Sequence, residues 1–181
     1  FCIDTANGAN IAVEKAIACL SKNGVKFIVG NVVSKECYKW VASLPSVIAV
    51  RCGISGGKSC TTKDATGVYR GNISAIKECA EIKGNTLLIA DGGIRSASDV
   101  CKAIAYGADL VMFGSLIAAC HDSPAEIRII DGTPYKVLSG SASFEIQRKY
   151  KNPKYVEGKT TLLPYTGNTL KDLITSISEG L

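Results

Sequence analysis

Histidine is almost absent from this sequence, because His121 is the only one among 181 residues. A Ser-His-Asp triad, a Cys-His pair or a histidine metal site would have to be built on that single imidazole. His121 lies in the segment His-Asp-Ser-Pro, whose composition is typical of a turn. The shortage of histidine therefore argues against enzymes that depend on an imidazole base or ligand.

Long apolar runs are missing as well, since no stretch of about 18 consecutive apolar residues exists, and this excludes a membrane-spanning helix. A signal peptide is not recognisable, although the chain starts at Phe1 inside an apolar run, so we expect residues before it. Paired metal-ligand spacing is lacking among the cysteines. Most of them lie in apolar stretches, which predicts reduced, mostly buried thiols in a cytoplasmic protein. They are Cys2, Cys19, Cys37, Cys52, Cys60, Cys79, Cys101 and Cys120.

The net charge of +5 includes a local surplus of basic residues over 148–159. No nucleic-acid motif accompanies this charge, and a solvated flap or a phosphate-bearing small substrate explains it as well. We therefore expect no nucleic-acid partner. With 46% hydrophobic residues and 18 glycines, the composition is typical of a single globular α/β domain over 1–181.

Strand, turn and helix recur along the chain every 20 to 40 residues, which is the rhythm of parallel βαβ units. Apolar runs predict strands over 1–4, 25–29, 46–51, 86–90 and 110–113. Periodic segments predict helices over 10–21, 34–43, 72–82, 96–106 and 169–179. The fold class is α/β, either the last five strands of a (β/α)₈ barrel or a doubly wound open sheet.

The segment 121–160 breaks this rhythm, because it is polar, charged and non-periodic. Its Asp131-Gly132-Thr133-Pro134 turn predicts a hairpin. An insertion of this length after the last strand of a barrel would form a flap over the mouth of the barrel.

A glycine-rich loop over 52–71 separates the predicted strand 46–51 from the next helix and carries Cys60 near its centre. Long polar loops at the ends of strands are usually functional or disordered. Such a loop could also carry an inert surface cysteine, and its residues alone leave both interpretations open.

The Asp91-Gly92-Gly93 and Gly114-Ser115 turns follow the last two strands, where backbone N–H groups could bind a phosphate. The alternative to phosphate binding is that the glycines serve only the geometry of two tight turns.

The loop sequence Gly-x-x-Gly-Gly-x-Ser-Cys-Thr-Thr-Lys, followed by Thr-Gly-Val, resembles the catalytic cysteine loop of the IMP dehydrogenase/GMP reductase family. Ser55-Gly56-Gly57 stands where that family usually has Gly-Pro-Gly. Gly140-Ser141-Ala142-Ser143 and Glu157-Gly158-Lys159 resemble the GMP reductase branch. The resemblance implies a partial (β/α)₈ barrel that converts GMP to IMP and ammonia with NADPH, through a covalent bond to the cysteine.

The same resemblance assigns the site residues. Catalysis would rest on Cys60, Thr62 and Glu157, and the nucleotide would be bound by Ser59, Asp91, Gly92, Gly93, Gly114, Ser115, Gly140, Ser141 and Ser143. The NADPH side would be formed by Asp4, Ala6, Asn7, Gly8 and Thr62, with Gly30-Asn31 as the next turn along. The family also implies a homotetramer and a K⁺ ion held by backbone carbonyls of Gly53, Gly57 and Cys60.

Two alternatives remain open at this stage. IMP dehydrogenase uses the same covalent chemistry in the direction of XMP, with NAD and water. The second alternative is a truncated, non-catalytic relative that binds nucleotide or recruits a subunit. A barrel that lacks three strands exposes two parallel edges, to which another chain could bind.

Overall fold

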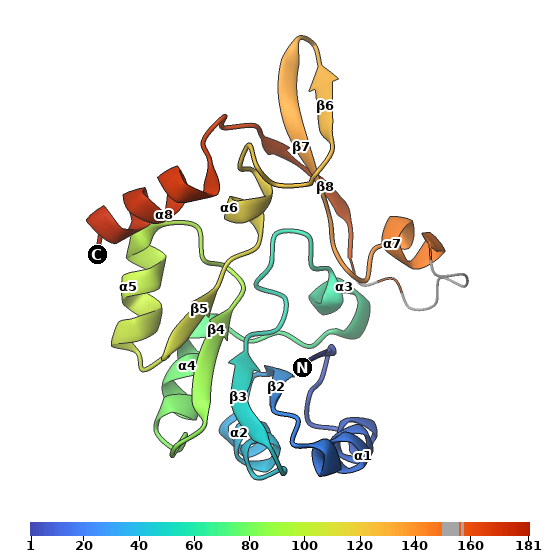
Figure 1. The fold of residues 1–181 in the computed structure, drawn as a ribbon, viewed down its shortest axis with the longest axis vertical. Coiled ribbons are helices and arrows are strands. Elements are labelled where there is room, and N and C mark those ends of the chain that lie inside the picture. The colour runs from blue at the N-terminus through green and yellow to red at the C-terminus, as the bar shows by residue number, and fades with distance from the viewer. Residues whose placement is uncertain (150–155, 157) are drawn as a thin grey trace.

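A computed structural model describes residues 1–149, 156 and 158–181 of the chain. Its main body is a parallel five-stranded sheet in the order β1-β2-β3-β4-β5 (Figure 1). These strands confirm the predicted βαβ rhythm, and they span Cys2–Asp4, Phe27–Val32, Val47–Cys52, Leu87–Asp91 and Leu110–Met112. The strand order follows the chain order without the reversal that defines a doubly wound sheet. The fold is therefore α/β and consistent with part of a (β/α)₈ barrel.

Five longer helices follow or precede these strands, and each lies within two residues of its predicted bounds. They are α1 (Ile11–Leu20), α2 (Lys35–Ala42), α4 (Asn72–Ala80), α5 (Ala97–Ala105) and α8 (Leu170–Glu179). A short 3₁₀ turn, Ser21–Asn23, extends α1. Polar N-caps explain the starts of four of them, because a side-chain oxygen accepts a backbone N–H in the first turn. These caps are Asn10, Ser34, Ser96 and Thr169.

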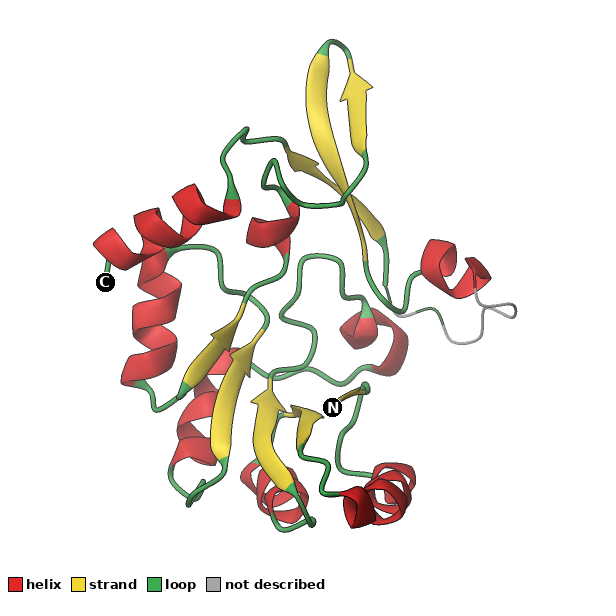
Figure 2. Cartoon of the chain, viewed as in Figure 1, coloured by secondary structure: helices red, strands yellow, loops and turns green. Residues whose placement is uncertain are grey.

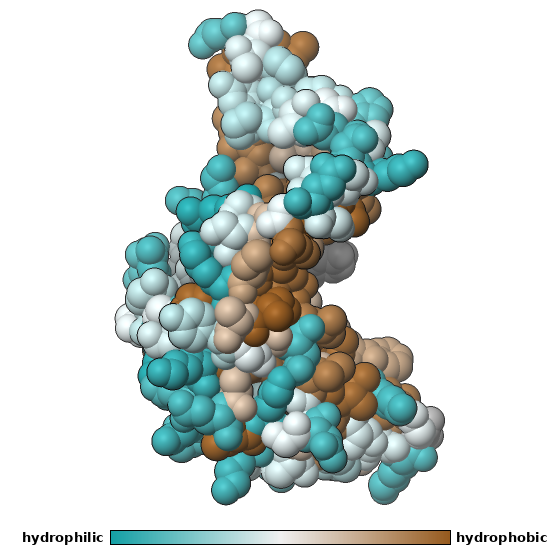
Figure 3. Space-filling view, turned by 90° about the vertical axis from the view of Figure 1, so that its left-hand side faces the viewer, coloured by the Kyte–Doolittle hydropathy of each residue, from teal (hydrophilic) through white to brown (hydrophobic). Residues whose placement is uncertain are grey.

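The two faces of the parallel sheet differ in how far their apolar side chains are buried. Val29, Val50 and Leu88 point to one face and form a fully buried core with residues from α1, α2, α4 and α5. On the other face, at the start of the strands, Leu87 and Leu110 are 42% and 49% exposed. Figure 3 shows apolar side chains gathered along the hollowed side of the molecule. The sheet is thus covered by helices on one face only.

A second, antiparallel sheet in the order β6-β7-β8 stands above the carboxyl ends of the parallel strands (Figure 2). Its strands are Ile127–Ile130, Thr133–Ser139 and Thr160–Pro164. Asp131 and Gly132 both have positive φ, as expected for a tight hairpin turn, so the predicted hairpin is confirmed. Its third strand was not predicted. The remaining short helices are α3 (Thr62–Thr66), α6 (Ser115–Ala118) and α7 (Phe144–Lys149).

Two expectations are wrong. Gly30-Asn31 is not a turn, because β2 continues to Val32 and the Asn31 backbone exchanges hydrogen bonds with Thr5 and Gly8 of the loop after β1. The cysteines are all free, as predicted, but only Cys52, Cys79 and Cys120 are buried. Amphipathic helices expose part of their surface, so an apolar neighbourhood in the sequence does not ensure burial. Within the described ranges, no helix has the length and apolarity needed to cross a bilayer.

Candidate active site

Cys60 lies in the loop that connects β3 to α4, directly before the single turn of α3. Its backbone N–H donates to the Gly57 carbonyl at 3.2 Å, and its thiol lies 3.2 Å from Thr62 Oγ1. The residue is half-buried, whereas Thr62 is buried. The cysteine sulfur is therefore held beside a hydroxyl that could take part in proton transfer, while part of the residue remains accessible.

The antiparallel sheet holds the Cys60 loop from above. Cys60 forms an antiparallel bridge with Gly158, and the Lys159 N–H donates to the Ser59 carbonyl at 2.9 Å. Ser59 Oγ also donates to Thr161 Oγ1 at 3.2 Å, at the start of β8. The predicted flap region thus meets the Cys60 loop through main-chain pairing at Ser59 and Cys60.

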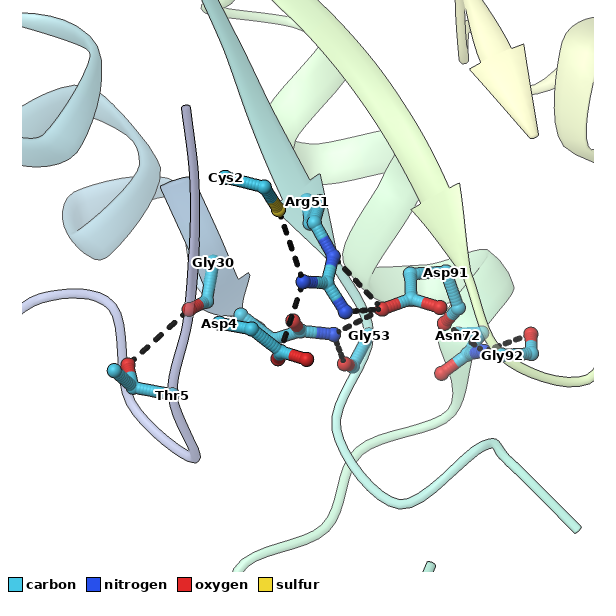
Figure 4. Close-up of polar contacts among 10 residues, drawn as sticks. Cys2, Asp4, Thr5, Gly30, Arg51, Gly53, Asn72, Asp91 and Gly92 are labelled. Atoms are coloured by element: carbon cyan, nitrogen blue, oxygen red, sulfur yellow. Dashed lines mark hydrogen bonds and ion pairs between the residues drawn. The ribbon is translucent and has the colours of Figure 1, made fainter. Parts of the chain in front are cut away.

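A buried guanidinium joins three strands on the inner face of the parallel sheet (Figure 4). Arg51 Nη2 lies 2.7 Å from Asp91 Oδ2, and Nη1 lies 3.1 Å from Asp4 Oδ1. Asn31 Nδ2 donates to the same Asp91 oxygen at 2.7 Å and to the Gly53 carbonyl. Burial alone would lower the pKa of Arg51, but the attraction of Asp91 and Asp4 outweighs burial and raises that pKa.

These elements enclose a pocket of about 440 Å³, within the range of small-molecule sites. It contains most of the residues assigned from the sequence, which come from the ends of four strands and from the antiparallel sheet. They are Asp4, Ala6, Gly53, Gly57, Ser59, Cys60, Thr62, Asp91, Gly92, Gly114, Ser115, Gly140 and Ser141. A smaller adjoining pocket of about 160 Å³ adds Gly93 and Arg95 and shares Lys58 with the first. The tertiary structure therefore brings the thiol and both glycine turns to one cavity.

Three of the assigned residues that the structure describes lie outside both pockets. Asn7 accepts the Ala9 N–H in its own turn, and Gly8 packs against Gly30, where a Cβ would lie 3.1 Å from backbone carbon. Ser143 is fully buried next to Gly158 and does not line the pocket. Glu157 lies outside the described residues, so its catalytic role remains a prediction.

The sequence reasoning missed several residues of the site, among them Arg51, Lys58, Arg95 and Asn72. Arg51 interrupts an otherwise apolar strand two residues before Gly53, which is an unusual place for a charge and could have identified it. Asn72 gives no such signal, because asparagine at a helix start normally suggests a cap.

Gly53 permits a backbone contact that any side chain would prevent. Its φ is +135°, and a Cβ there would overlap the Asp91 carbonyl oxygen.

We expect Gly53→Ala to lower the free energy of unfolding by about 1–3 kcal/mol, because the strained backbone and the displaced β4 end both cost stability. Gly71→Ala is the control, since nothing lies within 4 Å of its Cβ position. It should change the stability by less than about 1 kcal/mol. Urea denaturation of both variants measures the difference, and equal midpoints would contradict it.

No group of three or more His, Cys, Asp or Glu side chains that could hold a metal occurs in the part of the chain that the structure describes. The carbonyls of Gly53 and Gly57 line the pocket and accept hydrogen bonds from Asn31 and the Cys60 N–H. A carbonyl oxygen has a second lone pair, so both could also face a monovalent cation. Asn31 Oδ1 is buried without a hydrogen-bond partner among the described residues.

Comparison with known proteins places this geometry in a family. The sequence model of the IMP dehydrogenase / GMP reductase domain matches residues 1–181. GMP reductases of Streptococcus gordonii and Lactobacillus acidophilus are 39% and 36% identical to the chain over 99% of its length and 54% of theirs. An inosine-5'-monophosphate dehydrogenase of Helicobacter pylori is 35% identical over 99% of the chain and 40% of its own length. The chain spans about half the length of the curated relatives, and it belongs to the IMP dehydrogenase / GMP reductase family.

Proposed function

We propose that the protein catalyses the NADPH-dependent reductive deamination of GMP to IMP and ammonia. The supporting observation is that the Cys60 loop lines the same pocket as the Asp91, Gly114 and Ser115 turns. A thiol facing an anchored mononucleotide is the arrangement that covalent attack on a purine requires. The similarity to two GMP reductases supports this direction of the chemistry.

In this proposal the nucleotide lies along the carboxyl ends of β4 and β5. Asp91 would bind the ribose hydroxyls, because a carboxylate accepts hydrogen bonds from a diol. Backbone N–H groups of Gly93, Gly114 and Ser115 would surround the phosphate, together with Ser59. Lys58 and Arg95 line the smaller pocket beside them and would supply positive charge to a dianionic phosphate. Gly92, Gly140 and Ser141, which line the pocket, complete the proposed nucleotide set. Ser143 is buried behind them beside Gly158 and would support this segment without touching the nucleotide.

The chemistry assigned to this chain is nucleophilic. The Cys60 sulfur, as a thiolate, bonds to purine C2, and the C2–N2 bond then breaks as ammonia leaves with an added proton. Thr62 and Glu157 would move that proton, since Thr62 Oγ1 lies 3.2 Å from the sulfur. Bound NADPH supplies the hydride that C2 requires. Breaking the C2–S bond then frees IMP and regenerates the thiolate.

The residues at the amino-terminal side of the pocket fit a nicotinamide group. Asp4, Ala6 and Asn31 line that side. Asn31 Oδ1 is a buried acceptor that still lacks a donor within the described chain, and a carboxamide N–H would satisfy it. Asp4, Ala6 and Thr62 are therefore proposed as the NADPH side of the site. Asn7 and Gly8 do not line the pocket and would only shape the loop that carries Ala6.

The proposal extends to the whole assembly. The five parallel strands would be the last five of a (β/α)₈ barrel, and 121–160 would be its flap. The edges of β1 and β5 carry no further strand in the described chain, and the first three strands of such a barrel would pair with them. The homotetramer is proposed from the family resemblance. A K⁺ ion would be held by the carbonyls of Gly53, Gly57 and Cys60. We also propose a cytoplasmic location, which the free thiols support.

A direct assay tests the function. The protein is incubated with GMP and NADPH, and separately with IMP and NAD, while nicotinamide absorbance is followed. We expect NADPH consumption and IMP formation in the first mixture only. Turnover in the second alone would establish IMP dehydrogenase, which the Helicobacter pylori relative favours. No turnover in either, combined with nucleotide binding by titration, would favour a non-catalytic binding role, which the open sheet edges support.

A further inference from the structure

The base of the Cys60 loop is closed by the side chain of Asn72. Asn72 is the first residue of α4 and immediately follows the loop. Its amide does not cap its own helix but crosses to the end of β4 (Figure 4). There Nδ2 donates to the carbonyl of Asp91 at 3.1 Å and to the carbonyl of Gly92 at 2.6 Å. One amide group thus connects the helix that ends the nucleophile loop to the proposed nucleotide-binding turn.

The nucleophile loop also packs directly on this amide. A Cβ at Gly56 would lie 2.5 Å from Asn72 Nδ2 and 3.1 Å from the Gly92 carbonyl carbon. In the reverse direction, a Cβ at Gly92 would lie 3.0 Å from the Gly57 nitrogen. Neither glycine tolerates a side chain without movement of its neighbours. The backbones of the loop and the turn therefore touch each other, and the Asn72 amide lies beside this contact.

Only the nitrogen end of the Asn72 amide is hydrogen-bonded within the described residues. Its Oδ1 is buried and makes no hydrogen bond to any described residue, which offsets part of what Nδ2 gains. A flipped amide would turn this oxygen toward two carbonyls, so the amide orientation is set by the two hydrogen bonds that Nδ2 donates. The two Nδ2 hydrogen bonds therefore fix where the start of α4 lies relative to the end of β4.

We propose that Asn72 is a positioning residue that sets the distance between the Cys60 loop and the Asp91–Gly92 turn. This inference rests on the proposed function, because the turn anchors the nucleotide and the loop carries the nucleophile. Attack requires the reacting atoms to approach within about 3–3.5 Å, and a misplacement of about 1 Å costs roughly 10²-fold in rate. Loss of the Nδ2 contacts lets loop and turn move apart without removing any group that touches the nucleotide.

Two variants test the proposal. Asn72→Asp keeps the shape but replaces the donor by an acceptor that faces two carbonyls, and Asn72→Ala removes the amide. The rate at which iodoacetamide alkylates Cys60 is measured by mass spectrometry with and without GMP, beside kcat, KM and GMP affinity. We expect GMP to protect Cys60 in the wild type and to protect it far less in both variants. We expect kcat to fall by roughly 10²-fold while the GMP affinity changes little.

Ser74→Ala, at an exposed position of the same helix, is the matched control and should behave as the wild type. If GMP protects the variants as well as the wild type and kcat is unchanged, Asn72 has no positioning role and the inference falls alone. If GMP fails to protect Cys60 even in the wild type, the proposed function falls and the inference with it. If both variants unfold at markedly lower temperature than Ser74→Ala, Asn72 is a structural residue and the inference is overturned.

Discussion

Cys60→Ala is expected to abolish GMP turnover, with a loss of at least roughly 10³-fold in kcat. The sulfur is the atom that would bond to purine C2, and alanine offers no nucleophile in its place. Nucleotide binding should be nearly unchanged, because the ribose and phosphate contacts proposed for Asp91, Gly114 and Ser115 remain. Steady-state kinetics with GMP and NADPH, combined with a calorimetric titration of GMP, measures both effects.

The chain offers a matched control for this substitution. Cys101 is an exposed thiol on α5, and the pocket does not include it. Cys101→Ala should retain wild-type kcat and KM, which separates the loss of one specific sulfur from the general effect of removing a thiol. A Cys60→Ala variant that turns over GMP at the wild-type rate would remove the covalent mechanism.

Arg51→Met should produce the largest loss of stability among single substitutions in the site, about 3–5 kcal/mol in the free energy of unfolding. Only 9% of the Arg51 side chain is exposed, and it neutralises Asp91, of which 17% is exposed. Methionine fills a similar volume but leaves the Asp91 carboxylate without its cation. Urea denaturation followed by circular dichroism measures the change.

A double-mutant cycle with Asp91→Asn shows whether the ion pair is the cause. The two substitutions together should cost less than the sum of each alone, by about 0.5–3 kcal/mol, because the neutral amide no longer needs the guanidinium. Arg128→Met is the control, since Arg128 is half exposed and its contact with Glu126 is 3.5 Å long. It should change stability by less than about 1 kcal/mol. Strictly additive losses for Arg51 and Asp91 would contradict the coupling.

The elements of the parallel sheet could be predicted because their signals are local. A polar cap such as Ser34 or Ser96 and an apolar period of 3.6 mark each helix within a few neighbouring residues. The strand β8 was missed for the opposite reason. Thr160–Pro164 pairs with β7 across an intervening helix and loop, and no local pattern distinguishes it from an extended linker.

Burial was predicted less well than secondary structure. Cys2 lies in an apolar run yet is exposed, because β1 is an edge strand and its inner face carries the Arg51 cluster. Gly30-Asn31 resembled a turn in sequence, but the backbone of Asn31 finds partners at Thr5 and Gly8 and the strand continues. In both cases a segment distant in sequence decided the outcome.

By itself the sequence determined the order of strands and helices, the glycine-rich loop around Cys60 and the family resemblance that the comparisons confirm, because periodicity, capping and motif spacing are properties of neighbouring residues. Only the tertiary structure decided that Arg51 meets Asp4 and Asp91, and that the Asn72 amide lies between loop and turn. Those contacts join residues 19 to 47 positions apart. They exist because parallel strands bring their carboxyl ends to one edge of the sheet, and no linear pattern records which side chains meet there.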